Sequence, residues 1–195
     1  MVSKLYFRHG AMNSGKSTAL LQVAFNYEER GQKVLLTKPA VDTKGDSKVV
    51  SRLGMVRNVD FLTLPNDDLR ASVREHAQAS KVDCLLIDEA QFLTRAQVDQ
   101  AMEIAVLDNI PVLAYGIRTD FLTNGFPGSI RLLEIAHSLE ELKTICRCGK
   151  KALFNARLKN GVFVFDGDQV AIDGDQVTYE SLCPSCYYRE LGKTK

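Results

Sequence analysis

Eight residues near the N-terminus have the types and the spacing of a loop that binds phosphate groups. They fit the pattern G-x-x-x-x-G-K-[ST] and run Gly10, Ala11, Met12, Asn13, Ser14, Gly15, Lys16 and Ser17. The glycines let the backbone curl so that successive N–H groups point at phosphate oxygens. In such a loop Lys16 reaches the β- and γ-phosphates, and the Ser17 hydroxyl holds Mg²⁺. The pattern predicts a site for the triphosphate of ATP; the alternative is a glycine-rich turn before an ordinary helix.

Two adjacent carboxylates, Asp88 and Glu89, follow the apolar run CLLI at residues 84–87. An aspartate at the end of such a run is typical of the magnesium-side carboxylate of proteins with this loop. We therefore expect Asp88 to hold Mg²⁺ together with Ser17. Glu89 is then placed to act as a general base, which takes a proton from an attacking hydroxyl or water. The alternative is a pair of solvated carboxylates at a strand end.

Four of the five cysteines are grouped late in the chain as two close pairs. Cys146 and Cys148 form the first pair, Cys183 and Cys186 form the second, and Cys84 stands alone. Four thiolates around one ion make a closed, tetrahedral zinc site of the structural kind. Such a site stabilises a domain that is too small for a core of its own. The alternative is four reduced cysteines without a metal.

Short apolar runs alternate with helical patterns over residues 4–116, and these are the elements that must position the candidate groups. We expect strands at 5–9, 34–37, 61–64, 82–87 and 112–115, and helices at 17–30, 68–80 and 94–107. Thr94 can cap the last of these helices, and the polar stretch 38–58 is expected to be a long, mobile loop. Alternating strands and helices predict an α/β fold with a parallel central sheet and right-handed crossovers.

The pattern changes after about residue 143, where short β-like runs at 152–158 and 162–165 lie between Gly and Asp turns. The four grouped cysteines bracket this region. We therefore predict two domains, an α/β nucleotide-binding domain at 1–143 and a small, zinc-binding, β-rich domain at 144–195.

Composition and charge narrow the class of protein. The chain has 195 residues, of which 45% are hydrophobic and 25% charged, as in an ordinary folded protein. Its formal net charge is +1, whereas nucleic-acid-binding proteins usually have an excess of basic residues. We therefore expect no nucleic-acid partner. No apolar run approaches the roughly 20 residues that span a bilayer, and residues 1–10 lack a signal-peptide core. We expect a cytoplasmic protein with no membrane partner and with reduced cysteines.

Taken together and in order, these segments resemble the type II thymidine kinases, the cellular, zinc-containing family. The resemblance covers nearly the whole chain and rests on the phosphate loop, DEAQF at 88–92, GIRTDF at 116–121, LKTICRC at 142–148, Tyr179, and Cys183 to Cys186. It implies a RecA-like main domain and a zinc-stapled lasso domain. It also implies an ATP:thymidine 5′-phosphotransferase, which moves the γ-phosphate of ATP to the 5′-hydroxyl of thymidine and makes dTMP in nucleoside salvage for DNA synthesis.

The resemblance implies roles for individual residues. Glu89 matches the family's catalytic base, and ATP contacts are implied for the phosphate loop and for Asp88, Glu89, Ala90 and Gln91. A lasso at 170–179 would hold the base largely through backbone hydrogen bonds. The implied nucleoside contacts are Met12, Phe92, Phe121, Val170, Ala171, Ile172, Asp173, Gly174 and Tyr179. Arg52, in the stretch 38–58, could reach phosphate when that stretch closes.

The same resemblance implies ligands, cofactors and an assembly. These are thymidine and ATP as substrates, Mg²⁺ and structural Zn²⁺, dTTP as a feedback inhibitor, and a homotetramer. Two departures concern the lasso, where Ile172-Asp173-Gly174 replaces the family's common Ile-Gly-Gly and where 172–179 is one residue longer. Because the lost glycine removes freedom at positive φ, deoxyuridine remains an alternative main substrate.

Two other interpretations stay open from the residues alone. The first is an ATPase or helicase-like motor, because DEAQ at 88–91 resembles a DEAD-type box. A helicase normally needs two such domains and a basic nucleic-acid surface. The second is a nucleotide-binding module without catalysis, which has no need of a base at Glu89.

Overall fold

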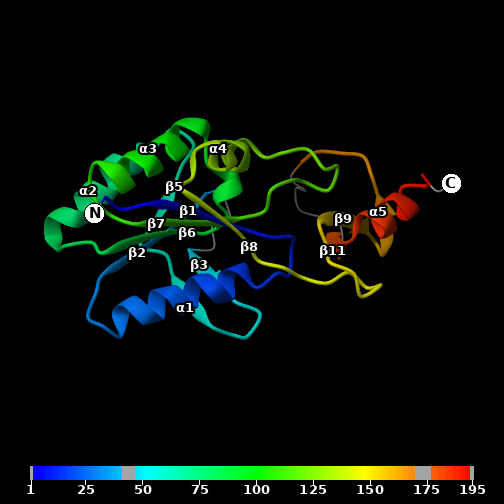
Figure 1. Ribbon diagram of the computed structural model, residues 1–195, viewed down its shortest axis with the longest axis horizontal. Helices are drawn as coiled ribbons and strands as arrows, with labels where there is room; N and C mark the ends of the chain where they lie inside the picture. The colour runs from blue at the N-terminus through cyan, green and yellow to red at the C-terminus, as the bar shows by residue number, and fades with distance from the viewer. Residues whose placement is uncertain (1, 41–46, 170–176, 194–195) are drawn as a thin grey trace.

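A six-stranded parallel sheet forms the centre of the computed structural model, which describes residues 2–40, 47–169 and 177–193 (Figure 1). Its strands are β1 (Leu5–His9), β2 (Val34–Pro39), β5 (Phe61–Thr63), β6 (Cys84–Ile87), β7 (Val112–Gly116) and β8 (Ser138–Glu141). They lie in the order β5-β2-β6-β7-β1-β8, and every neighbouring pair is parallel. The predicted α/β class with a parallel central sheet is confirmed.

Helices cover both faces of this sheet (Figure 1). Helix α1 (Lys16–Glu28) covers one face. The other face is covered by α2 (Leu69–Ala79), α3 (Arg95–Val106) and α4 (Pro127–Ile135). Leu36 and Leu86 pack with α1 in one buried cluster, whereas their neighbours Leu35 and Leu85 pack with the other three helices. Right-handed crossovers require two faces, because the chain moves one way along the sheet after β1 and the other way after β5. No helix of the described ranges is both long and apolar enough to cross a membrane.

A hairpin lies inside the stretch 38–58, where we predicted a mobile loop. Its strands are β3 (Lys48–Val50) and β4 (Val56–Asn58), which pair antiparallel. Val49 is buried in the cluster on the α1 side, and Gly54 turns the chain at a φ of 83°. The prediction is therefore wrong for residues 47–58, because three-residue strands offer too few alternating positions to be recognised. Residues 41–46 lie outside the described residues.

The other predicted elements are confirmed with boundaries that differ by a few residues at most. In α3, Thr94 accepts the N–H of Gln97, and the Gln97 side chain accepts the N–H of Thr94 in return. This reciprocal cap fixes the start of the helix, as the sequence indicates. Besides the hairpin, the elements not predicted are α4, β8, β11 (Val177–Leu182), α5 (Pro184–Glu190) and a short 3₁₀ helix at Ala90–Phe92.

A separate three-stranded antiparallel sheet lies at the opposite end of the molecule from α2 (Figure 1). Its order is β10 (Val162–Val164), β9 (Phe154–Lys159) and β11, and α5 follows it. Cys146, Cys183, Cys186 and Tyr187 share a buried cluster of their own with side chains of this sheet. The predicted β-rich, cysteine-containing unit is confirmed, whereas its exact boundary at residue 144 stays a prediction.

Candidate active site

The phosphate loop connects the carboxyl end of β1 to the first turn of α1. Crossovers leave β1 and β7 in opposite directions along the sheet, and the edge at such a point is where α/β proteins bind ligands. Two residues of the loop have a positive φ, Asn13 at 66° and Gly15 at 79°. Gly10 has no room for a side chain, since a Cβ atom there would lie 2.3 Å from the carbonyl oxygen of Leu142. Close packing therefore requires glycine at Gly10, and the left-handed backbone favours it at Gly15.

Lys16 directs its ammonium group into the curl of this loop. Its Nζ donates to the carbonyl oxygen of Ala11 at 2.9 Å and to that of Gly10 at 3.3 Å. Burial lowers the pKa of Lys16, and the nearby carboxylates of Glu89 and Asp88 act in the opposite direction. The structure thus places this cation between the loop and the acidic pair, where a triphosphate would need it.

A cavity of about 800 Å³ lies in front of the loop. Lys16, Ser17, Glu89 and Arg52 all line it, so the structure brings four of the candidate groups together. The remaining lining residues are Met12, Asn13, Gly15, Thr18, Ala19, Gln22, Val50, Leu53 and Ile117. Its volume falls within the range of about 300–1,000 Å³ that is usual for ligand sites. Arg52 comes from the hairpin, and its charge also lowers the pKa of Lys16.

Glu89 is held in one orientation by its neighbours. Its backbone is left-handed, with φ at 48° and ψ at 38°, a conformation that costs a non-glycine residue about 1–3 kcal/mol. Its Oε2 accepts a hydrogen bond from Nε2 of Gln91 at 2.5 Å. Oε1 of Gln91 in turn accepts the N–H of Ile117, just past the end of β7, at 3.3 Å. Gln91 therefore orients the carboxylate that we predict to be the base.

Asp88 directly follows β6 and is only 5% exposed. Burial, followed by the negative charge of Glu89, raises the pKa of its carboxyl to about 7. A divalent cation at this carboxylate would favour its charged form, so the position fits the predicted magnesium ligand. Ala90 and Gln91 are buried as well, and the ATP contacts predicted for them stay a prediction.

The turn after Glu89 rests on α4. Residues Ala90–Phe92 form a short 3₁₀ helix, η1, and a Cβ on Gly128 of α4 would lie 2.5 Å from the carbonyl oxygen of Ala90. The backbones of the two elements are therefore in direct contact. The ring of Phe92 packs edge-on against that of Phe126, with 5.4 Å between their centres. This contact helps fix η1, and a nucleoside contact by Phe92 stays a prediction.

Phe121 and Tyr179, two predicted nucleoside contacts, meet at a residue that the sequence did not single out. The Arg157 guanidinium lies 3.6 Å from the centre of the Phe121 ring, and its Nε donates to the Tyr179 hydroxyl at 3.1 Å. Its terminal nitrogens donate to the carbonyl oxygens of Asp168 and Gln169 at 2.8 and 3.0 Å. An arginine in a strand pattern carries no signal of such a role, because its partners lie elsewhere in the chain.

Arg157 is 5% exposed, so its hydrogen bonds are partly shielded from water. The two carbonyl groups that it binds immediately precede residue 170, where the predicted lasso begins. Arg157 therefore fixes the point from which that segment starts. The predicted contacts Val170, Ala171, Ile172, Asp173 and Gly174 themselves lie outside the described residues.

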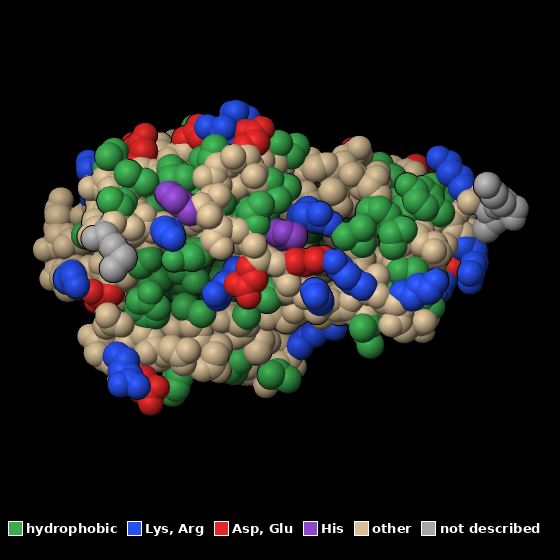
Figure 2. Space-filling model, in the orientation of Figure 1, with side chains coloured by type: hydrophobic (Ala, Val, Ile, Leu, Met, Phe, Trp, Pro, Cys, Tyr) green, Lys and Arg blue, Asp and Glu red, His purple; other side chains and the backbone are tan. Residues whose placement is uncertain are grey.

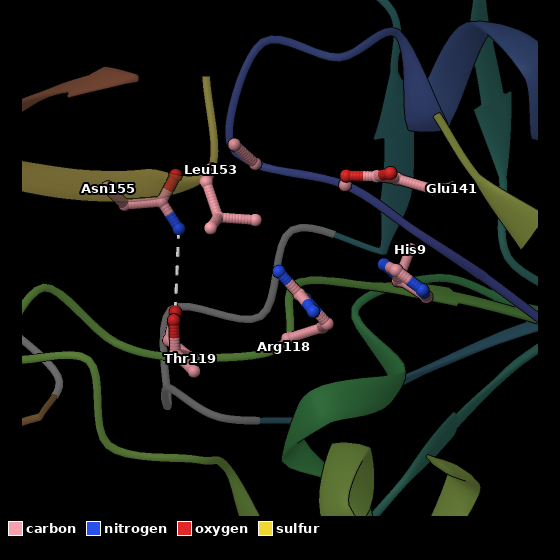
Figure 3. A pocket seen from close by; sticks show the side chains of 8 residues that line it. His9, Arg118, Thr119, Glu141, Leu153 and Asn155 are labelled. Atoms are coloured by element: carbon pink, nitrogen blue, oxygen red, sulfur yellow. Dashed lines mark hydrogen bonds between the residues drawn. The ribbon is translucent and has the colours of Figure 1, made fainter. Parts of the chain in front are cut away.

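A second and much smaller pocket lies behind the phosphate loop, between the two sheets (Figure 3). Its lining includes His9 and Glu141 from the central sheet, Arg118, and Asn155 from β9. With about 10 Å³ it has room for roughly one water molecule and is too small for a nucleotide. Burial, followed by the charge of Arg118, lowers the pKa of His9, and its Nδ1 has no hydrogen-bond partner among the described residues.

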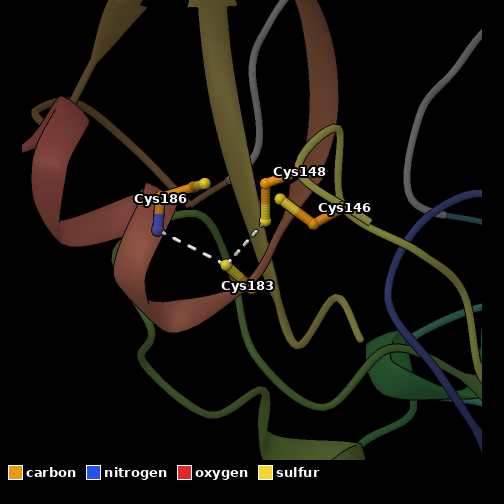
Figure 4. A group of neighbouring side chains, drawn as sticks. All are labelled: Cys146, Cys148, Cys183 and Cys186. Atoms are coloured by element: carbon orange, nitrogen blue, oxygen red, sulfur yellow. Dashed lines mark hydrogen bonds between the residues drawn. The ribbon is translucent and has the colours of Figure 1, made fainter. Parts of the chain in front are cut away.

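The four grouped cysteines converge beside the small sheet (Figure 4). The Sγ atoms of Cys146, Cys148, Cys183 and Cys186 all lie within 4.8 Å of one another, and none is in a disulfide. Tetrahedral zinc with Zn–S bonds of about 2.3 Å holds its sulfur atoms roughly 3.8 Å apart. The donor set and the spacing therefore fit a structural zinc ion. Cys84 lies apart from them, fully buried in β6.

Comparison with known proteins gives a consistent result over nearly the whole chain. The thymidine kinase family profile matches residues 3–187. A protein named thymidine kinase from Idiomarina loihiensis is 49% identical over 193 residues, which cover 98% of this chain and 99% of that protein. A thymidine kinase of Legionella pneumophila (strain Lens) is 49% identical over 197 residues, covering 99% and 93%. One from Aliivibrio fischeri is 46% identical over 194 residues, covering 98% and 100%.

Proposed function

Because this chain belongs to the thymidine kinase family, we propose that it transfers the γ-phosphate of ATP to the 5′-hydroxyl of thymidine and releases dTMP. The observation that carries the proposal is the shared cavity of the phosphate loop and Glu89, which Lys16 and Ser17 line together with the candidate base. A binding module without catalysis has no use for a carboxylate that Gln91 holds in the cavity.

Phosphoryl transfer depends on alignment and on neutralising charge. Lys16 and the loop N–H groups would hold the β- and γ-phosphates, while Ser17 and Asp88 would hold Mg²⁺, which supplies positive charge to the phosphate oxygens when bound. Glu89 would accept the proton of the 5′-hydroxyl as the bond to phosphorus forms. Arg52 lines the same cavity, which supports a phosphate contact by its side chain.

The deciding experiment is a coupled assay of ADP release with ATP and Mg²⁺. Thymidine, deoxyuridine, deoxycytidine, deoxyadenosine and single-stranded DNA are supplied one at a time. We expect turnover with thymidine and a product phosphorylated at the 5′ position. Faster turnover with deoxyuridine would make that nucleoside the main substrate. ATP hydrolysis that is stimulated by single-stranded DNA, with no nucleoside-dependent turnover, would instead favour the ATPase or helicase-like motor.

Lys16→Ala is expected to weaken ATP binding by about 10–100-fold, because a charged hydrogen bond contributes about 1.5–3 kcal/mol. The turnover rate should fall as well, because the same ammonium group neutralises charge during transfer. Titration calorimetry with ATP and Mg²⁺ measures the affinity. Lys4→Ala, an exposed lysine at the start of β1, is the control and should bind ATP as the wild type does. Unchanged affinity in Lys16→Ala would refute the assignment of the phosphate loop.

Arg157→Lys is expected to raise the KM for thymidine about tenfold, because lysine keeps the charge but loses the planar fork that binds Asp168 and Gln169. The affinity for ATP should stay near that of the wild type, because the hydrogen bonds of Arg157 go to Tyr179, Asp168 and Gln169 and not to the phosphate loop. Steady-state kinetics in both substrates separate the two effects. Arg189→Lys, an exposed arginine of α5, is the matched control. A wild-type KM in Arg157→Lys would show that the hydrogen bonds of Arg157 do not support the nucleoside site.

We also propose the remaining partners that the family resemblance implies. Zn²⁺ would stabilise the small sheet through the cysteine cluster, because the four sulfur atoms fit its geometry. Thiolate ligands suit a reducing compartment, so the cytoplasm is the proposed location. dTTP should inhibit competitively with thymidine, which a series of inhibition curves measures. A homotetramer should give a light-scattering mass four times that of the chain.

A further inference from the structure

We propose that the three-stranded sheet sets the shape of the phosphate loop through Asn155 and Ser181, two positioning residues that hold the backbone of Met12. The inference rests on the proposed ATP-binding role of that loop and deepens it. It assigns to the small sheet a task on the ATP side of the site, in addition to its proposed nucleoside side.

Both backbone groups of Met12 are bound by this sheet. The N–H of Met12 donates to Oδ1 of Asn155 at 2.7 Å, and the Met12 carbonyl oxygen accepts a short hydrogen bond from Oγ of Ser181. Asn155 and Ser181 stand opposite each other in the pairing of β9 with β11. One cross-strand pair therefore binds the donor and the acceptor of a single loop residue.

These hydrogen bonds are partly shielded from water. Asn155 is 3% exposed and Ser181 is 6% exposed. A buried N–H that loses its partner is penalised more heavily than the bond itself contributes, so the contact strongly favours one loop shape. Nδ2 of Asn155 also donates to the carbonyl oxygen of Thr119 at 3.4 Å, which Figure 3 shows as a dashed line. Asn155 thereby joins the phosphate loop to the segment that follows β7.

The two hydrogen bonds from Asn155 and Ser181 to the backbone of Met12 form a clamp. This clamp lies next to the least favourable backbone conformation of the loop. Asn13 follows Met12 and has a φ of 66°, and its carbonyl oxygen accepts from the Thr144 hydroxyl at 3.4 Å. Left-handed backbone at a non-glycine residue persists only where its surroundings impose it. Because Asn155 occupies the N–H of Met12, that donor is not free to meet phosphate. Asn155 and Ser181 thus select which donors face ATP.

The clamp also lies close to the cysteine cluster. Ser181 precedes Cys183 by two residues, and Sγ of Cys183 caps the N-terminus of α5. The position of the Ser181 hydroxyl therefore depends on the end of β11 that the cluster fixes. The cysteine cluster is thereby connected, through the end of β11 and the Ser181 hydroxyl, to the backbone of the phosphate loop.

The test measures ATP binding in the full-length protein without thymidine. Ser181→Ala and Asn155→Leu each remove one clamp bond, and each should weaken ATP affinity by about tenfold, the change that about 1.4 kcal/mol produces. Ser181→Thr keeps the hydroxyl and should restore affinity to within about threefold of the wild type. Thr178→Val, at an exposed position of β11, is the matched control and should bind ATP normally. Titration calorimetry gives the affinities.

Two further measurements separate positioning from general damage to the sheet. Zinc content and the thermal midpoint should stay near wild type in Ser181→Ala. Amide hydrogen exchange should quicken in a peptide that spans the phosphate loop. Wild-type ATP affinity and loop exchange in both Ser181→Ala and Asn155→Leu would overturn the clamp. So would a Ser181→Thr variant as weak as Ser181→Ala. The proposed function fails by a different result, the absence of thymidine-dependent turnover in the wild type.

Discussion

Glu89→Gln is expected to lower kcat for thymidine phosphorylation by about 10²–10⁴-fold, the usual contribution of a positioned general base. Glutamine has nearly the same shape but accepts no proton, so the 5′-hydroxyl keeps its proton as the bond to phosphorus forms. The affinity for ATP should stay within about threefold of the wild type, because the Lys16 and Ser17 contacts remain. Rapid-quench measurement of a single turnover, alongside calorimetry with ATP, reports the two quantities separately.

Glu75→Gln is the matched control, because Glu75 lies exposed on α2 and should leave kcat unchanged. Gln91→Leu gives a graded comparison. It removes the hydrogen bonds that orient Glu89 but leaves the carboxylate in place, so its loss of kcat should be smaller. If the Glu89→Gln variant turned over thymidine at the wild-type rate, the base would have to be another group.

Cys183→Ser is expected to abolish zinc binding and to unfold the small sheet at temperatures where the wild type is folded. Binding of structural zinc contributes apparent free energies of about 10–16 kcal/mol in small zinc domains, and much of this is folding free energy. Cys183 also caps α5 and follows β11, so its loss should disturb both Tyr179 and Ser181. Elemental analysis should find one zinc ion per chain in the wild type and none in the variant.

Cys84→Ala is the control for a lost thiol, because Cys84 belongs to β6 and not to the cluster. That variant should keep its zinc and lose only the modest stability of one small buried side chain. Freshly purified wild-type protein without zinc, or a Cys183→Ser variant that retains it, would count against the structural metal site.

The sequence predicted those parts of the fold whose cause is local. Thr94 and Gln97 lie in one helical turn, so the cap of α3 is visible in the residues themselves. The buried strands β6 and β7 stand out as continuous apolar runs. The hairpin β3–β4 and the strand β8 do not, because they are short and owe their conformation to packing on the rest of the chain.

The candidate site likewise contains residues that the local sequence indicates and residues whose roles depend on distant parts of the chain. The phosphate loop and the acidic pair are contiguous, so their spacing alone indicates their chemistry. Gln91 could be named as a neighbour of Glu89, but its hydrogen bond to the backbone of Ile117 depends on the adjacency of β6 and β7. Arg157 and Asn155 gave no signal, because their partners lie far away along the chain and no spacing rule links them.

The hydrogen bonds to Met12 have a consequence for the order in which the protein is made. Asn155 and Ser181 follow Met12 by 143 and 169 residues. At about 5–20 residues per second, a ribosome needs roughly 7–34 s to add that much chain. The phosphate loop thus leaves the ribosome long before its clamp exists. A nascent chain that has completed the central sheet but not β11 should bind ATP poorly, and full affinity should emerge only with the last strand.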